Sequence, residues 1–325
     1  MFNKIFKMEQ TYFGLFIIII LLCWAILPKW SLNTVCLSLA NGMVVLSLLV
    51  LMRTGLMSFG HGMYYCLGGY SVALSYNFLN INEALILISF AALVGFIISF
   101  LLGFFVRRFR GIFFAMLNLA FSMILFGVIA KTIFLGSTDG FGIREVTYLS
   151  LSPSDPSRLN LYCYIFILIT SGLAMLLVLI YLNSPMGKMI SAIKENEIRS
   201  SYLGIDVNKH IHKSYVISGI LASLGGGLMV LLIGHVTPED TAYWTKSGEF
   251  VFVAILSGSS NIFAPILGSL FFEFIRTYAL FYFPNTWQMI IGIILILGII
   301  YLPDGLGSLF EKFRRNKSVI KSRKT

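Results

Sequence analysis

Nine stretches of the sequence contain no Asp, Glu, Lys or Arg, and each holds about the 20 residues that a helix needs to cross a hydrocarbon core roughly 30 Å thick. Inside such a core every backbone polar group must be paired, which a helix achieves within its own segment and an open strand does not. A β-barrel would instead show alternating segments of about ten residues, and the sequence has none. The prediction is therefore an all-α polytopic integral membrane protein.

The overall composition supports the same prediction. Hydrophobic residues make up 58% of the 325 residues, and charged residues make up only 12%. Soluble domains carry about 25% charged residues. A water-soluble monomer with this composition would expose more apolar surface than soluble proteins tolerate, so that class is excluded.

The net charge of +10 comes from basic residues that gather at particular places along the chain. Most of them lie in five clusters, at 4–7, 53, 107–110, 188–213 and 312–324. Lys and Arg concentrate in the short cytoplasmic loops of membrane proteins, so these clusters predict cytoplasmic N- and C-termini. Membrane orientation thus explains the positive charge, and no nucleic acid is expected as a partner.

The predicted crossings follow the apolar stretches, at 11–28, 32–52, 56–79, 84–106, 112–135, 161–182, 213–234 and 287–303. Region 249–282 contains Gly258 and Pro265, and because Gly and Pro interrupt helices, we expect it to descend, break and return. The descending arm is either a full span or a half-helix of about nine residues, roughly 13 Å long. The total is about 9–10 transmembrane helices with interrupted segments.

These crossings define the expected domain organisation. Residues 1–310 form one transmembrane domain with a cytoplasmic loop at 183–212, and residues 311–325 form a basic cytoplasmic tail. The loops at 136–160 and 235–248 then face the opposite side.

Glycine-interrupted segments lie in both halves of the chain, at Gly55–Gly69 and Gly258–Gly268. Small residues allow close helix packing, whereas unwound backbone at membrane depth lines a wet cavity or is buried in protein. Both interpretations stay open. The candidate residues for a translocation path are Gly55, Ser58, Gly60, His61, Gly69, Glu249 and Gly258.

The sequence lacks the motifs of catalysis. It contains no phosphate-binding G-x-x-x-x-G-K-[ST] loop, so the chain itself is not expected to bind ATP in that way. It also shows no nucleophile–base or metal-ligand spacing, which disfavours a membrane-bound enzyme and predicts no cofactor. Glu273 and Arg276 are three residues apart and are expected to pair on one helix face.

Several ordered motifs follow one another along the chain, namely Thr54–Gly62, Arg110–Phe121, Ser137–Gly140, Ser184–Lys188, Ala192–Glu197, Leu203–Asp206 and Leu302–Leu306. Together they resemble the LivM-type permease subunits of branched-chain amino acid importers. The resemblance implies the permease fold of ATP-binding-cassette importers in the bacterial inner membrane. It also implies a second permease of the LivH type, two cytoplasmic ATPase subunits, an extracytoplasmic binding protein and a small solute.

The residues of the loop at 183–212 support a structural interpretation without the resemblance. Residues 188–203 are expected to form one short amphipathic helix, and Gly204 fits the position just past its end. The resemblance implies that this is the coupling helix that docks on the ATPase, and the alternative is a solvated connecting loop. The expected coupling residues are Lys188, Ile193, Glu195, Glu197, Leu203 and Gly204.

Two other transport functions remain as alternatives. Closely similar permeases carry urea or short amides, so the solute stays open. A stand-alone secondary transporter would need an inward-facing carboxylate at mid-membrane for a coupling ion, and the sequence suggests no such central residue.

Overall fold

The computed structural model describes residues 29–144, 146–148, 156–259, 261–302 and 305–307. Its elements in chain order are α2 (Lys29–Met52), α3 (His61–Leu79), α4 (Ala84–Val106), α5 (Gly111–Lys131), η1 (Ile133–Leu135), β1 (Phe141–Gly142), α6 (Pro156–Asn183), α7 (Pro185–Glu195), α8 (Glu197–Tyr202), α9 (Val207–Ile233), β2 (His235–Val236), α10 (Pro238–Thr241), α11 (Trp244–Ser257), α12 (Ala264–Tyr282) and α13 (Trp287–Tyr301). The all-α prediction is confirmed. The crossing expected at 11–28 and the tail at 311–325 lie outside the described residues.

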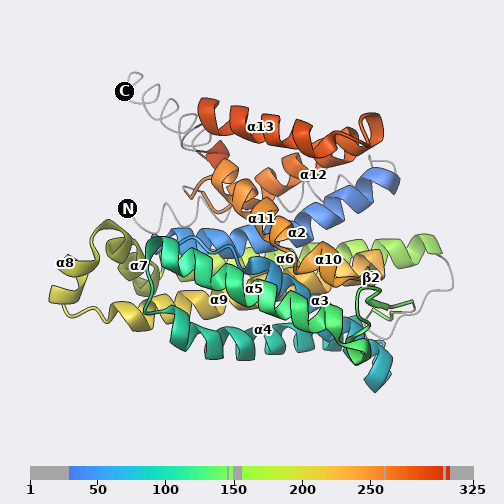
Figure 1. Ribbon diagram of the computed structural model, residues 1–325, viewed down its shortest axis with the longest axis horizontal. Helices are drawn as coiled ribbons and strands as arrows, with labels where there is room; N and C mark the ends of the chain where they lie inside the picture. Colours follow the sequence, from blue (N-terminus) through green and yellow to red (C-terminus); the bar gives the residue numbers. More distant parts are fainter. Residues whose placement is uncertain (1–28, 145, 149–155, 260, 303–304, 308–325) are drawn as a thin grey trace, which may run out of the picture.

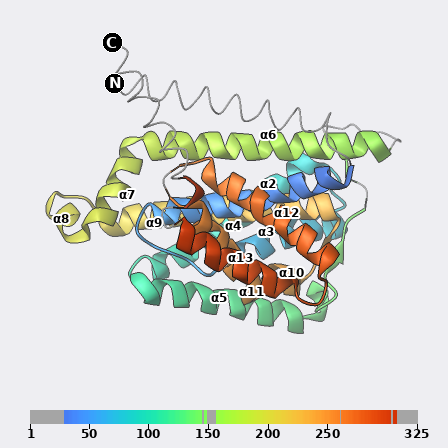
Figure 2. The same cartoon turned by 90° about the horizontal axis from the view of Figure 1, so that it is seen from above.

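The long helices form a bundle whose centre is α2 and α9. The most apolar windows of these two helices are 89% and 72% buried, against 28% and 22% for α4 and α5. Figure 2 shows α6 along one side of the bundle and α5 along the other, with α2, α3 and α9 between them. The outer helices therefore expose the apolar side chains that suit a lipid environment.

Small residues allow α9 to approach its neighbours closely. A Cβ added at Gly68 of α3 would overlap the Ser223 carbonyl, and one added at Gly226 would overlap the Tyr65 carbonyl. The Ser223 hydroxyl also donates to the Ala91 carbonyl of α4 at 2.7 Å. Apolar side chains gain little by leaving lipid for each other, so close packing of this kind holds membrane helices together.

Six of the described helices are long and apolar enough to cross a membrane, namely α2, α4, α5, α6, α9 and α12. The predicted bounds of α4, 84–106, agree with the structure. Helix α3 begins at His61 instead of residue 56, because Gly55 has a φ of 81° and the chain stays non-helical up to Gly60.

The predicted break in region 249–282 is confirmed. Helix α11 ends at Ser257, Gly258 follows with a φ of 75°, and α12 starts at Ala264. The 14 residues of α11 cover about 21 Å, so its length lies between the two alternatives, a half-helix of about nine residues and a full span of roughly 30 Å.

The single helix expected at 188–203 is wrong, because the chain forms two helices there. Asn196 ends α7 with extended backbone, and its Oδ1 accepts a hydrogen bond from the Arg199 N–H at 2.8 Å, so it caps α8. An Asn side chain satisfies a free N–H at a helix start, which favours a new helix over continuation of the old one. Helices α7 and α8 project at one end of the bundle, and the antiparallel pair β1–β2 lies toward the other (Figure 1).

The close crossing of α3 and α9 predicts a large effect for one added methyl group. Gly68→Ala should lower stability by about 1–3 kcal/mol or more, the usual cost of overpacking, because the new atom meets backbone that cannot rotate away. The measurement is the thermal unfolding midpoint of the detergent-solubilised protein. Gly127→Ala is the matched control, since an added Cβ there meets nothing within 4 Å in the described structure. Equal midpoints for the two variants would contradict this account of the packing.

Candidate functional site

The projecting α7–α8 segment begins with a well-formed helix start. Pro185 occupies the first turn of α7, and the Ser184 side chain accepts from the Gly187 N–H. Helix α7 buries Ile190 and Ile193 against the rest of the chain. The inward face of α7 therefore fixes the segment to the bundle.

Helix α8 and its C-terminal capping residue Leu203 present apolar side chains to the outside. Ile198, Tyr202 and Leu203 are 69%, 88% and 75% exposed. Of these three residues, only Leu203 was predicted from the sequence as a coupling residue. The signal for the other two was apolar residues four apart in an otherwise polar loop. Exposed apolar clusters of this kind are typical of protein or membrane interaction sites.

The predicted coupling residues fall into two groups. Lys188, Glu195, Leu203 and Gly204 are exposed, as a docking surface requires. Ile193 is buried, and Glu197 is only partly exposed. Gly204 has a φ of 84°, which glycine adopts without strain and which turns the chain from α8 toward α9.

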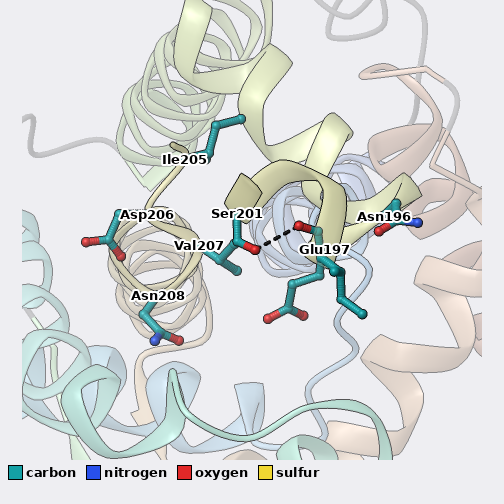
Figure 3. A pocket seen from close by; sticks show the side chains of 8 residues that line it. Asn196, Glu197, Ser201, Ile205, Asp206, Val207 and Asn208 are labelled. Carbon is teal, nitrogen blue, oxygen red and sulfur yellow. Dashed lines mark hydrogen bonds between the residues drawn. The ribbon is translucent and has the colours of Figure 1, made fainter. Parts of the chain in front are cut away.

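An open groove of about 770 Å³ lies between α8 and the start of α9. Its lining residues are Asn196, Glu197, Ile198, Ser201, Ile205, Asp206, Val207 and Asn208 (Figure 3). Asp206 caps α9 by accepting from the Lys209 N–H at 3.1 Å. The hydrogen bond from the Lys209 side chain lowers the pKa of the Asp206 carboxyl below its usual value.

Glu197 forms an ion pair within the chain. The Arg110 guanidinium donates to both carboxylate oxygens of Glu197, at 2.9–3.1 Å, and to Asn208 Oδ1 at 3.0 Å. Figure 3 shows the Glu197 and Asn208 side chains extending from α8 and α9 toward the same side of the groove. Glu197 therefore connects α8 to the start of α5, a contact that no local pattern could have predicted.

Most of the candidate path residues occupy buried packing positions. The Ser58 hydroxyl accepts from the Gly60 N–H, and Gly60 lies against the Asn118 backbone. The His61 Nε2 lies 2.6 Å from the Ser218 hydroxyl of α9. Gly69 lies next to Val230 and Val236. These four positions support the helix-packing interpretation.

The remaining two candidate glycines, Gly55 and Gly258, have a backbone role. Gly55 is exposed beside Lys194 of α7, and Gly258 is buried against Gly305. Both have positive φ, so each permits a turn at the end of a helix.

Glu249 is the candidate path residue that carries a partly accessible charge. It lies 2.9 Å from Lys246 Nζ and 3.5 Å from Arg276 Nη1, and the Arg276 guanidinium lies over the Trp287 ring at 5.4 Å. We call Lys246, Glu249 and Arg276 the charged cluster. The expected Glu273–Arg276 pair is wrong, because Arg276 extends across to α11.

Glu273 instead belongs to a buried hydrogen-bonded chain. It accepts from Asn41 Nδ2 of α2 at 2.6 Å, and Asn41 Oδ1 accepts from the Tyr65 hydroxyl of α3 at 2.7 Å. Glu273 is the tenth of the 19 residues of α12 and is only 3% exposed. The sequence suggested no central carboxylate, and Glu273 shows that this expectation is wrong. The side-chain partner of the Glu273 carboxyl is the neutral amide of Asn41, so a buried polar group is satisfied inside the bundle.

The fold and these sites define a polytopic membrane permease. The family described as the permease component of the branched-chain amino acid transport system matches residues 31–299, and the chain belongs to this family. Two relatives are the high-affinity branched-chain amino acid transport system permease proteins LivM of Salmonella typhimurium and Escherichia coli, each 26% identical over 284 residues. The resemblance to LivM-type permeases is thus confirmed.

The alignment covers 78% of this chain and 64% of either relative, so the chain spans slightly less than two thirds of their length. No solved structure matches the chain. In the described residues no group of three or more His, Cys, Asp or Glu side chains could hold a metal ion.

Proposed function

We propose that the chain is one permease subunit of an ATP-driven importer for branched-chain amino acids. The observation that carries the proposal is the family match over residues 31–299, which includes every described helix from α3 to α12. The protein lies in the bacterial inner membrane with both termini in the cytoplasm. ATP is hydrolysed by separate subunits, since the sequence has no phosphate-binding loop.

The proposed assembly contains a second permease of the LivH type, two cytoplasmic ATPases and an extracytoplasmic binding protein. Helix α8 docks on one ATPase. Its exposed Tyr202 and Leu203 supply apolar contact area, and the neighbouring Arg199 adds a charge at the rim. Apolar anchors surrounded by polar groups are the usual composition of a protein interface.

The charged cluster forms part of the wall of the solute path. Its Lys246, Glu249 and Arg276 side chains are 12%, 24% and 27% exposed, and Arg276 lies six residues, about 9 Å, from the end of α12. Charges at such depth face a bundle interior or a wet cavity, because lipid cannot solvate them. This face therefore meets water and the second permease.

Reconstitution tests the function directly. Proteoliposomes with both permeases, the ATPases and the binding protein should accumulate leucine, isoleucine or valine when ATP is supplied, and the chain alone should neither hydrolyse ATP nor accumulate them. Uphill uptake by the chain alone would favour the secondary transporter. ATP-driven uptake of urea or short amides, without branched-chain amino acids, would reassign the solute and leave the importer mechanism in place.

The docking surface predicts the effect of charge on α8. Tyr202→Asp and Leu203→Asp should each weaken ATPase binding about tenfold or more, since burying one such side chain is worth roughly 1.5–3 kcal/mol. The measurement is titration of the purified permease pair with the ATPase. Ile133→Asp is the control, because Ile133 is 89% exposed but lies in η1 at the other end of α5 from the α5–α8 contact. Unchanged affinity in both α8 variants would remove α8 from the interface.

The proposed path wall predicts which membrane-depth positions meet water. Phe252 is 45% exposed and follows Glu249 by three residues on α11, so the two share a face. In the assembled importer, Phe252→Cys should react with a small water-soluble thiol reagent, because the reactive thiolate forms only in water. Leu93→Cys, 52% exposed on the outer helix α4, should stay unlabelled. If both cysteines are equally protected from the reagent, water does not reach the face of α11 that carries Glu249 and Phe252.

A further inference from the structure

The Arg110 side chain joins three separate parts of the cytoplasmic end. Its Nε and Nη2 donate to the Glu197 carboxylate of α8, and Nη2 also donates to Asn208 Oδ1 of α9. Its Nη1 donates to the carbonyls of Arg107 and Phe109 in the α4–α5 connection. All five N–H donors of the guanidinium are thereby used, and the planar group is fixed in orientation.

Helix α5 is held to the bundle along one narrow line. Four of its residues are buried, and Phe114, Asn118 and Ser122 among them follow at four-residue steps on one face. The opposite face is open, with Ile112, Phe113 and Met116 between 63% and 75% exposed. A helix held along a single contact line can shift lengthwise along that line at a smaller packing cost than a helix buried on all sides.

The same line of α5 reaches the segment beside the charged cluster. The Ser122 hydroxyl donates to the Ala242 carbonyl at 3.0 Å, and the Phe126 ring lies 5.2 Å from the Tyr243 ring. Ala242 and Tyr243 connect α10 to α11, and α11 carries Lys246 and Glu249. One helix thus contacts α8 at its first turn and the start of α11 further along.

We propose that α5 is a lever that carries movement of α8 to the start of α11, with Arg110 as the positioning residue that holds its cytoplasmic end. This inference rests on the proposed function and names the connection between its docking surface and its path wall. A shift of α8 either displaces the first turn of α5 or breaks the Arg110–Glu197 pair. A rigid helix transmits that displacement along its length to Ser122 and Ala242.

A double-mutant cycle in the reconstituted importer tests the link. Arg110→Ala and Glu197→Ala should each lower leucine uptake about tenfold, within the roughly 5- to 150-fold range of coupling between sites. The double variant should lose no more than either single variant, since both remove the same interaction. ATP hydrolysed per leucine imported should rise in all three, whereas simple loss of folded protein would lower both rates and leave that ratio unchanged.

Three further variants keep the test independent of folding. Arg110→Lys retains the charge but loses the planar fork, so its uptake should fall between those of the native protein and Arg110→Ala. Ser122→Ala removes the contact at the other end of the lever and should also raise the ATP-to-leucine ratio. Arg108→Ala is the matched control, because Arg108 is exposed on the same turn and forms no ion pair in the described part of the chain.

The outcomes separate the lever from the importer proposal. Multiplied losses in the double variant, or native ATP-to-leucine ratios in both Arg110 variants and in Ser122→Ala, would overturn the lever while leaving a working importer. Absence of ATP-driven leucine uptake in the native complex would instead reject the proposed function.

Discussion

The close approach of α9 to α2, α3 and α4 is the contact on which the other parts of the bundle depend. In lipid, apolar side chains gain little by leaving their surroundings for each other, so helices associate where backbones come near and polar groups pair. Gly68, Gly219 and Gly226 permit that approach, and Ser218 and Ser223 donate across it to neighbouring helices. The outer helices α5 and α6 then need only cover this centre.

This arrangement distinguishes the closely packed centre of the bundle from its less tightly held cytoplasmic end. The buried hydroxyl and amide groups of Tyr64, Asn118 and Tyr215 form one hydrogen-bonded chain between α3, α5 and α9. At the cytoplasmic end, by contrast, α8 is a six-residue helix with exposed side chains and one ion pair, in which the Arg110 guanidinium contacts both carboxylate oxygens of Glu197. Stability is concentrated inside the bundle, and the proposed docking surface on α8 is attached through a small number of polar contacts.

Local sequence patterns predicted the features that depend on neighbouring residues alone, such as the positions of helices and of a helix break. Charge-free length located the long helices, and Gly258 with Pro265 located the break between α11 and α12. The break at Asn196 was missed, because a single capping side chain outweighed the continuing helical pattern. The partners of Glu197 and Glu273 lie 87 and 232 residues away, so spacing alone could not reveal them. In the candidate site, the exposure of Lys188, Glu195, Leu203 and Gly204 could be predicted from the sequence. The inward packing of Ile193 and the ion pair of Glu197 could be seen only in the folded structure.

The Asn41–Glu273 hydrogen bond has a consequence for biogenesis. Helices enter the membrane in the order of synthesis, and an unpaired carboxylate at the centre of a span costs about 2.5–3.5 kcal/mol on insertion scales. Asn41 in α2 is synthesised 232 residues before Glu273, and Tyr65, which orients it, follows soon after Asn41. Asn41, which donates a hydrogen bond to the Glu273 carboxylate, is therefore already in the bilayer when α12 is inserted. When α2 and α3 have already packed together, Glu273 meets its hydrogen-bond partner as α12 joins them, and this pairing offsets the insertion cost of the carboxylate.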